Sequence, residues 1–179
     1  MSTNSNIIIQ VSDSFINTVH QFAPTALPFP ESQWDSHGEY RDSDKSQPVK
    51  IIKPFLGIYC HWDGYPDVVG KALITQFDTF EKAFNLIIGG DCSVITDDQV
   101  LRYATRPAEE WKNIQPKQLD KVQKFTEWAH YVYVFKNDHW YLYTGDLLLI
   151  LPKDVSSLND YIRGYEDGVE DGITFARFK

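Results

Sequence analysis

The residues from Gly57 to Pro66 constrain the fold most, because a run of β-branched and aromatic side chains, GIYCHW, ends there in a turn. Such a run is typical of a strand, which we expect over Ile51–Trp62 with an interruption at Pro54. Asp63 and Gly64 favour a turn, and the following proline cannot extend a β-ladder. We therefore expect a central strand that ends at residue 62 and a sharp bend directly after it.

Two short helices are expected after this bend. Apolar residues recur at helical spacing over residues 68–77 and again over residues 80–88. Asp78 and Glu81 are spaced as a capping box at the start of the second helix, and the glycine pair at 89–90 would end it. The sequence thus predicts a strand followed by two helices as the central unit of the fold.

A β-hairpin is expected further along the chain. Tyr131–Phe135 and Trp140–Tyr143 show strand-like alternation on either side of a short polar loop, and we expect this hairpin to pair with the strand that ends at Trp62. A β-rich run, Ile7–Val11, opens the chain and precedes apolar residues at helical spacing from Phe15 onward. The predicted fold class is α+β. It comprises a small antiparallel sheet, made of the strand ending in HWDG and the C-terminal aromatic hairpin, packed against short helices.

Two other segments give weaker patterns. Pro116 is suited to open a helix, because proline is favoured in the first turn. One side of that helix would carry an apolar stripe made of Leu119, Val122, Phe125 and Ala129. Residues 94–106 show no regular pattern, and we expect them to be irregular.

The chain has the length of one domain, and its acidic residues gather in two places. With 179 residues, it is expected to fold as a single domain over residues 1–179. Residues 23–50 contain prolines and five acids between Glu31 and Asp44, which predicts a long acidic loop or insertion. Residues 154–179 form an acidic C-terminal segment, with six acids between Asp154 and Asp171. Acids and bases nearly balance in the rest of the chain.

Net charge and motif content exclude several classes of function. The formal charge of −8 argues against non-specific binding to nucleic acid or to an anionic membrane. The apolar runs are far shorter than the roughly 20 residues of a membrane span, and the first run lacks the basic start of a signal peptide. No P-loop, dinucleotide-binding, GxSxG or zinc-finger spacing occurs, so we expect no cofactor and no metal. The two cysteines are expected to be reduced and buried in a cytoplasmic protein.

The segment GIYCHWDGYPDVVG, with IIGGDCSVI downstream, resembles a family of small, mostly uncharacterised proteins of bacteriophages, prophages and other mobile elements. Members carry an IYCHWDGYP-like segment, a following Gly and Leu on a helix, and a GD-x-S element after a second helix. The matching residues here are Ile58 to Pro66, Gly70, Leu73, Gly90, Asp91 and Ser93. The resemblance extends over residues 55–95. It implies that the protein originates from a phage or other mobile element and is located in the cytoplasm of a bacterial host. It implies no particular reaction. Residues 103–107 match only loosely the basic stretch that members carry after GD-x-S.

His61 and Asp63 form half of a general-base arrangement, because side chains two residues apart on an extended backbone share one face. Cys60 points to the opposite face, which argues against a cysteine nucleophile activated by His61. Asp91 would complete an oxygen-and-nitrogen site for a divalent metal if it met the other two in space. The structural alternative is that His61 and Asp63 satisfy turn amides, while Tyr59 and the neighbouring Trp and Tyr side chains pack in the core.

A binding site is the other interpretation of the same region. Tryptophan and tyrosine side chains supply flat surfaces that stack on a base or anchor a protein partner, and an arginine can neutralise a phosphate locally. The aromatic candidates also include Trp111, Trp128 and Trp140. The predicted ligand-binding or partner-binding residues are Trp62, Tyr65, Asp63, Asp91, Ser93, Arg102 and Arg106.

We expect a non-enzymatic accessory protein of a phage or mobile element that acts by binding a protein partner. It would inhibit a defence protein of the host or of a competing element, because its acidic stretches can mimic nucleic-acid charge toward a basic site. The first alternative is sequestration of a small nucleotide signal. The second is a metal-assisted nucleotide hydrolase that uses His61, Asp63 and Asp91.

Overall fold

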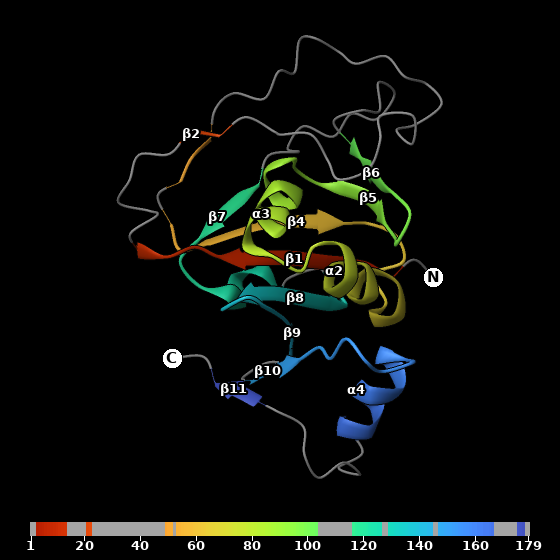
Figure 1. Cartoon of the computed structure of the whole chain (residues 1–179). Coiled ribbons are helices and arrows are strands. Elements are labelled where there is room, and N and C mark those ends of the chain that lie inside the picture. Colours follow the sequence, from red (N-terminus) through yellow and green to blue (C-terminus); the bar gives the residue numbers. More distant parts are fainter. Residues whose placement is uncertain are drawn as a thin grey trace.

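A mixed β-sheet with helices on one face runs through the part of the chain that the structure, a computed structural model, describes (Figure 1). The described residues are 3–13, 21–22, 49–51, 53–103, 116–126, 129–144, 147–166 and 175–177. The strands are β1 (Ser5–Gln10), β2 (Gln21–Phe22), β3 (Val49–Lys50), β4 (Phe55–Cys60), β5 (Cys92–Ile95), β6 (Val100–Arg102), β7 (Lys117–Leu119), β8 (Tyr131–Lys136), β9 (His139–Tyr143), β10 (Leu147–Ile150) and β11 (Phe175–Arg177). The helical segments are the π-helical turn η3 (Pro66–Gly70), α2 (Lys71–Gln76), α3 (Phe80–Ile88), the 3-10 turn η5 (Val122–Phe125) and α4 (Leu158–Glu166).

The order of strands in the described sheet is β11-β10-β9-β8-β1-β4-β5-β6, and β7 pairs with the same edge of β4 as β5 does. Strand β1 runs antiparallel to β4 and parallel to β8, and β4 runs parallel to β5. Strands β8, β9 and β10 form an antiparallel meander, and β11, which follows α4 in the chain, pairs antiparallel with β10. The predicted α+β class is confirmed. The prediction of a small antiparallel sheet is wrong, because the sheet is larger and mixed.

Strand β1 lies in the middle of the sheet because its isoleucines are buried on both faces. Ile7, Ile8 and Ile9 are all fully buried. Ile7 and Ile9 belong to the core beneath the helices, and Ile8 belongs to a second core on the other face. Strand β8 pairs with β1, from Ser5↔Tyr131 onward, and not with β4. The predicted pairing of the aromatic hairpin with the strand that ends near Trp62 is therefore wrong, although the hairpin itself is confirmed.

The expected unit of a strand followed by two helices is confirmed. After β4 the chain forms η3 and α2, then α3, and β5 returns parallel to β4, so that these helices lie over one face of the sheet (Figure 1). The side chain of Thr79 caps α3 by accepting a hydrogen bond from the backbone N–H of Lys82 at 3.3 Å. The predicted capping box of Asp78 and Glu81 is wrong, because the threonine directly before the helix takes that position.

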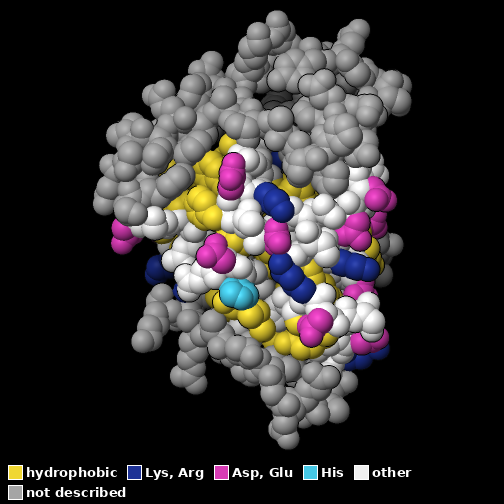
Figure 2. Space-filling view, viewed as in Figure 1, with side chains coloured by type: hydrophobic (Ala, Val, Ile, Leu, Met, Phe, Trp, Pro, Cys, Tyr) yellow, Lys and Arg dark blue, Asp and Glu magenta, His cyan; other side chains and the backbone are white. Residues whose placement is uncertain are grey.

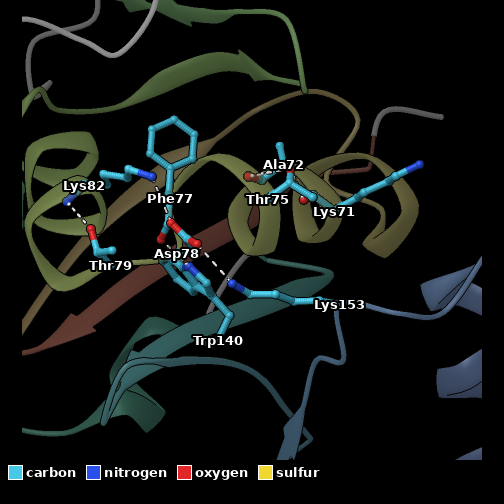
Figure 3. Close-up of polar contacts among 9 residues, drawn as sticks. All are labelled: Lys71, Ala72, Thr75, Phe77, Asp78, Thr79, Lys82, Trp140 and Lys153. Atoms are coloured by element: carbon cyan, nitrogen blue, oxygen red, sulfur yellow. Dashed lines mark hydrogen bonds and ion pairs between the residues drawn. The ribbon is translucent and has the colours of Figure 1, made fainter.

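Asp78 instead joins the helix layer to the C-terminal part of the chain (Figure 3). Its two carboxylate oxygens accept hydrogen bonds from Lys82 and Lys153, each at 3.0 Å. These hydrogen bonds lower the pKa of Asp78 below its ordinary value. Beside them, the indole N–H of Trp140 on β9 donates to the carbonyl oxygen of Phe77 at 2.8 Å, in a buried position. The junction between α2 and α3 is thus bound to β9 and to the segment before α4.

The second face of the sheet carries η5 instead of a regular helix. Residues 117–119 form β7 against β4, and only Val122–Phe125 turn helically. Phe125 occupies the space above Gly57, where a Cβ atom would collide with the phenyl ring. The predicted helix from Pro116 is therefore wrong, because pairing with the open edge of β4 and packing of Phe125 onto Gly57 outweigh the helical spacing.

Residues 94–106 were expected to be irregular. Their described part instead belongs to the hairpin of β5 and β6, in which Val94 lies opposite Leu101. The side chain of Thr96 accepts hydrogen bonds from the backbone N–H groups of Asp98 and Gln99, at 3.3 and 3.2 Å. A hydroxyl that binds nearby backbone donors in this way stabilises a turn. The sequence lacked a long apolar alternation here because the two strands are only three and four residues long.

The acidic C-terminal segment contains a helix, α4, whose first turn is held by Asp67 of η3. The carboxylate of Asp67 accepts hydrogen bonds from the backbone N–H groups of Leu158 and Asn159 and from the hydroxyl of Ser157. A carboxylate at this position satisfies donors that the helix leaves unpaired, and it opposes the positive end of the helix dipole. Residue Asp67 therefore fixes α4 against the helices that follow β4.

Several predictions lie outside the described residues. The predicted acidic loop or insertion at 23–50 falls mostly there, although its ends are described: β2 and β3 pair antiparallel, with Phe22 opposite Val49. The helical spacing from Phe15, and residues 167–174 and 178–179 of the C-terminal segment, also lie outside. Among the described helices, none has both the length and the apolar character needed to span a bilayer.

We predict that Gly57→Ala lowers the free energy of unfolding by about 1 to 3 kcal/mol, because the added methyl group must displace the Phe125 ring. Urea unfolding of both proteins measures the difference. In a Phe125→Ala background the same substitution should cost much less, since the obstructing ring is gone. An equal cost in both backgrounds would contradict this account of η5.

Candidate functional site

The turn after β4 crosses the start of β1, at the side of the sheet where the N label stands in Figure 1. The backbone N–H of Gly64 donates to the carbonyl oxygen of Thr3 at 2.7 Å, and the hydroxyl of Tyr133 donates to the carbonyl oxygen of Gly64 at 2.8 Å. A Cβ at Gly64 would lie 2.6 Å from the carbonyl carbon of Asn4, so a glycine is required. Asp63 has a φ of 56°, a conformation that aspartate tolerates better than most residues. The turn is therefore closely fixed.

Two aromatic side chains of this turn face solvent. Trp62 is 44% exposed and Tyr65 is 41% exposed, and they are the exposed large hydrophobic residues among those described. The Trp62 ring meets the His61 ring edge-on, with 4.6 Å between centroids, and Tyr65 lies near Tyr131 with 6.3 Å between centroids. The part of the structural alternative that places Trp62 and Tyr65 in the core is therefore wrong. Trp140, another aromatic candidate, is buried.

A chain of hydrogen bonds joins His61 to His130. The hydroxyl of Tyr59 lies 3.0 Å from Nδ1 of His61 and accepts a hydrogen bond from Nδ2 of Asn4 at 3.0 Å. Oδ1 of Asn4 lies 2.8 Å from Nδ1 of His130 and accepts a hydrogen bond from the backbone N–H of His130 at 3.0 Å. We call Asn4, Tyr59, His61, Trp62, Asp63, Tyr65 and His130 the sheet-end site.

Asp91 is buried and serves the sheet instead of the sheet-end site. Its Oδ1 accepts a hydrogen bond from the backbone N–H of Tyr59 at 2.8 Å, at the edge of β4 between its pairings with β7 and with β5. Burial raises the pKa of Asp91 to about 6, although the Tyr59 N–H and the charge of Lys117 act in the opposite direction. Along this edge of β4, β7 pairs with residues 55–57 and β5 pairs with Cys60. Between these two strands, the carboxylate of Asp91 accepts the hydrogen bond that a neighbouring strand would otherwise accept.

Arg102 and Ser93, two predicted binding residues, are buried as well. The guanidinium of Arg102 donates to the carbonyl oxygens of Leu86 at 2.7 Å and Gly90 at 2.9 Å, which lie at the end of α3. Burial lowers the pKa of Arg102. The carbonyl oxygen of Ser93 accepts the backbone N–H of Trp62 at 2.9 Å. Arg102 therefore satisfies the last carbonyl groups of a helix, as cations near helix C-termini do.

The described residues hold no group of three His, Cys, Asp or Glu side chains that could bind a metal ion. His61, Asp63 and Asp91 are thus not brought together as the metal site that the hydrolase hypothesis requires. Cys60 and Cys92 are free and buried, as predicted. Burial raises the pKa of both thiols, that of Cys92 to about 11, so they are protonated near neutral pH and are poor nucleophiles.

Sequence reasoning missed Asn4, Tyr59 and His130 as members of the site. The position of Tyr59, two residues before His61, was a usable signal, since both side chains then share one face of the strand. No comparable signal existed for His130, which lies 126 residues from Asn4. Only the parallel pairing of β1 with β8 brings these two residues together. Arg106, Trp111 and Trp128 lie outside the described residues.

Charged side chains are interspersed on the face seen in Figure 2, where Lys and Arg lie between Asp and Glu. No patch of one sign dominates the described part of that face. Comparison with protein-family models, with curated proteins and with solved structures finds no match to this chain. The family resemblance of residues 55–95 therefore stays a prediction, and function has to be argued from the sheet-end site.

We predict that Asp91 makes the protein less stable as the pH rises. Its pKa is about 6 in the folded chain and ordinarily 3.8, so its contribution is fully present below pH 3.8 and is lost as the pH rises through 6. From about pH 5 to about pH 8 this should remove about 1.5 kcal/mol. Urea unfolding at both pH values measures the loss. In Asp91→Asn that part of the pH dependence should be absent, and an unchanged pH dependence would contradict the assignment.

Arg102→Met should lower the free energy of unfolding by about 2 to 4 kcal/mol, because it leaves the carbonyl groups of Leu86 and Gly90 without their donor. Arg163→Met is the matched control, since that side chain is 70% exposed on α4 and should change stability little. Thermal unfolding of both variants makes the comparison. If Arg102→Met unfolds at the wild-type temperature, the arginine is not a structural cap.

Proposed function

We propose that this chain acts by binding a partner protein, as an accessory protein of a bacteriophage or other mobile element that inhibits a defence protein of the host or of a competing element. The observation that supports binding is the exposure of Trp62 and Tyr65 on a turn that is otherwise closely fixed. Large aromatic side chains are usually placed in the core, and their exposure together marks a contact surface.

The rigidity of the turn favours a protein partner. Aromatic anchors that are already held in place lose little conformational entropy when a partner covers them. Tryptophan and tyrosine are also enriched among the residues that contribute most to protein interfaces. The net charge of −8 would speed the approach of a basic partner and slow that of an acidic one. The origin from a mobile element rests on the resemblance of residues 55–95 alone.

The two alternatives have less support. Sequestration of a nucleotide signal would use Trp62 for stacking, but the guanidinium of Arg102, one of the two arginines suggested for the phosphate, already binds the end of α3. Calorimetry against cyclic nucleotides tests this alternative. The metal-assisted hydrolase lacks the cluster of His61, Asp63 and Asp91 on which it was based.

We predict that the double substitution Trp62→Ala with Tyr65→Ala weakens partner capture at least about tenfold, because two exposed anchors are lost. The measurement is capture from host lysate by the immobilised full chain, at physiological and at high salt. The double variant should melt close to the wild-type temperature, since the replaced side chains are half exposed.

His139→Ala is the control, because His139 is exposed in the hairpin between β8 and β9, at the other end of the sheet. It should leave capture unchanged. Equal capture by the double variant and the wild type would show that the turn is not the binding surface. Failure of the wild type to retain any specific partner under either salt condition would count against the proposed function itself.

A further inference from the structure

The side-chain amide of Asn4, in the middle of the hydrogen-bond chain of the sheet-end site, has one orientation only. The backbone N–H of His130 lies 3.2 Å from the backbone carbonyl oxygen of Asn4 and 3.0 Å from a side-chain atom of Asn4. Because an N–H can only donate, an amide nitrogen at 3.0 Å would oppose it, and that side-chain atom is the carbonyl oxygen Oδ1. The amide nitrogen Nδ2 of Asn4 then faces the hydroxyl of Tyr59, to which it donates at 3.0 Å. The usual ambiguity between oxygen and nitrogen in an asparagine side chain is thus removed by a backbone group.

This orientation fixes the position of the proton on the His130 ring. Nδ1 of His130 lies 2.8 Å from Oδ1 of Asn4, an acceptor, and so must carry a hydrogen. In the neutral imidazole the other nitrogen, Nε2, then has a lone pair and accepts hydrogen bonds. His130 is exposed, so the ring presents an acceptor at the surface. Asn4 cannot pass protons along the chain, and its role is to orient the ring.

Two other groups suited to a cation lie on the same end of the sheet. Asp63 is an exposed carboxylate, and the neighbouring Trp62 ring is exposed. The turn that carries both is hydrogen-bonded to Thr3, and His130 is hydrogen-bonded to Asn4, so the two sides of the site are joined by consecutive residues. The turn also reaches β8 directly, because the hydroxyl of Tyr133 donates to the carbonyl oxygen of Gly64 at 2.8 Å and the Tyr65 and Tyr131 ring centroids are 6.3 Å apart.

We propose that the sheet-end site binds an arginine side chain of a basic partner protein, with His130 as a member of the site. A guanidinium offers several N–H donors, a positive charge and a flat face. Nε2 of His130 accepts a donor, Asp63 supplies the opposite charge, and the Trp62 ring supplies a surface for cation–π stacking. The net charge of −8 adds long-range attraction for such a partner. This inference rests on the proposed function and specifies the chemistry of the partner.

The test uses two matched probes on the full-length, 15N-labelled chain: acetyl-arginine amide, and acetyl-citrulline amide, which is nearly the same shape but neutral. NMR follows the imidazole nitrogens of His130 and the indole N–H of Trp62. Before any probe is added, His130 should show the Nδ1–H tautomer. The arginine probe should shift both sets of signals, and the citrulline probe should shift them much less.

Variants then assign the residues. His130→Ala and Asp63→Asn should each weaken binding of the arginine probe by about fivefold, and His139→Ala should not. Asn4→Ala should abolish the preference for the Nδ1–H tautomer of His130, a spectroscopic change that a purely structural role would not produce. Both His130 and Asp63 are exposed, so their substitution should leave the fold intact.

Four outcomes would overturn the inference. Two of them are an Nε2–H tautomer of His130 in the wild type and an equal response to the arginine and citrulline probes. The other two are a larger response to acetyl-lysine amide or to AMP than to the arginine probe, and no response to any probe. These results are separable from a failure of the proposed function. Partner capture that depends on Trp62 and Tyr65 without arginine binding would overturn this inference alone. Arginine binding without partner capture would support the site and count against the inhibitory role.

Discussion

The burial of β1 on both faces is the constraint on which the rest of the structure depends. Ile7 and Ile9 fill the core under the helices and Ile8 fills the core on the other face, so β1 has to lie inside the sheet. Strand β4 occupies one of its edges and β8 the other. The end of β4, the start of β1 and the start of β8 therefore meet on one side of the molecule, where the sheet-end site is formed.

Polar residues near this site divide into those that complete the fold and those that face solvent. Asp91 substitutes for a strand partner of β4, and Arg102 satisfies carbonyl groups at the end of α3. Each binds a backbone group that would otherwise be buried without a partner. Trp62 and Asp63 are exposed to solvent, unlike Asp91 and Arg102. This exposure is the reason why they remain candidates for binding a partner.

Local features were predictable from the sequence, and pairings between distant segments were not. The turn at Asp63 and Gly64, the helices after β4 and the β8–β9 hairpin depend on residues close in sequence. The hairpin pairs with β1, and residues 117–119 form a strand against β4 instead of the predicted helix. Both outcomes depend on contacts with strands that are far away in the chain. Periodicity carries no information about which strands lie side by side, because many orders bury the same apolar faces.

By itself, the sequence determined that a strand ending in an aromatic turn is followed by two helices, since backbone preferences and apolar spacing act over a few residues. It also indicated that His61, Asp63 and Asp91 were candidates for chemistry. Only the tertiary structure decided that Asp91 is buried and binds the backbone of Tyr59, and that Asn4 and Tyr59 together join His61 to His130. The reason is that side chains more than a hundred residues apart meet only when strand order brings them together, and that order follows from burying the whole chain at once.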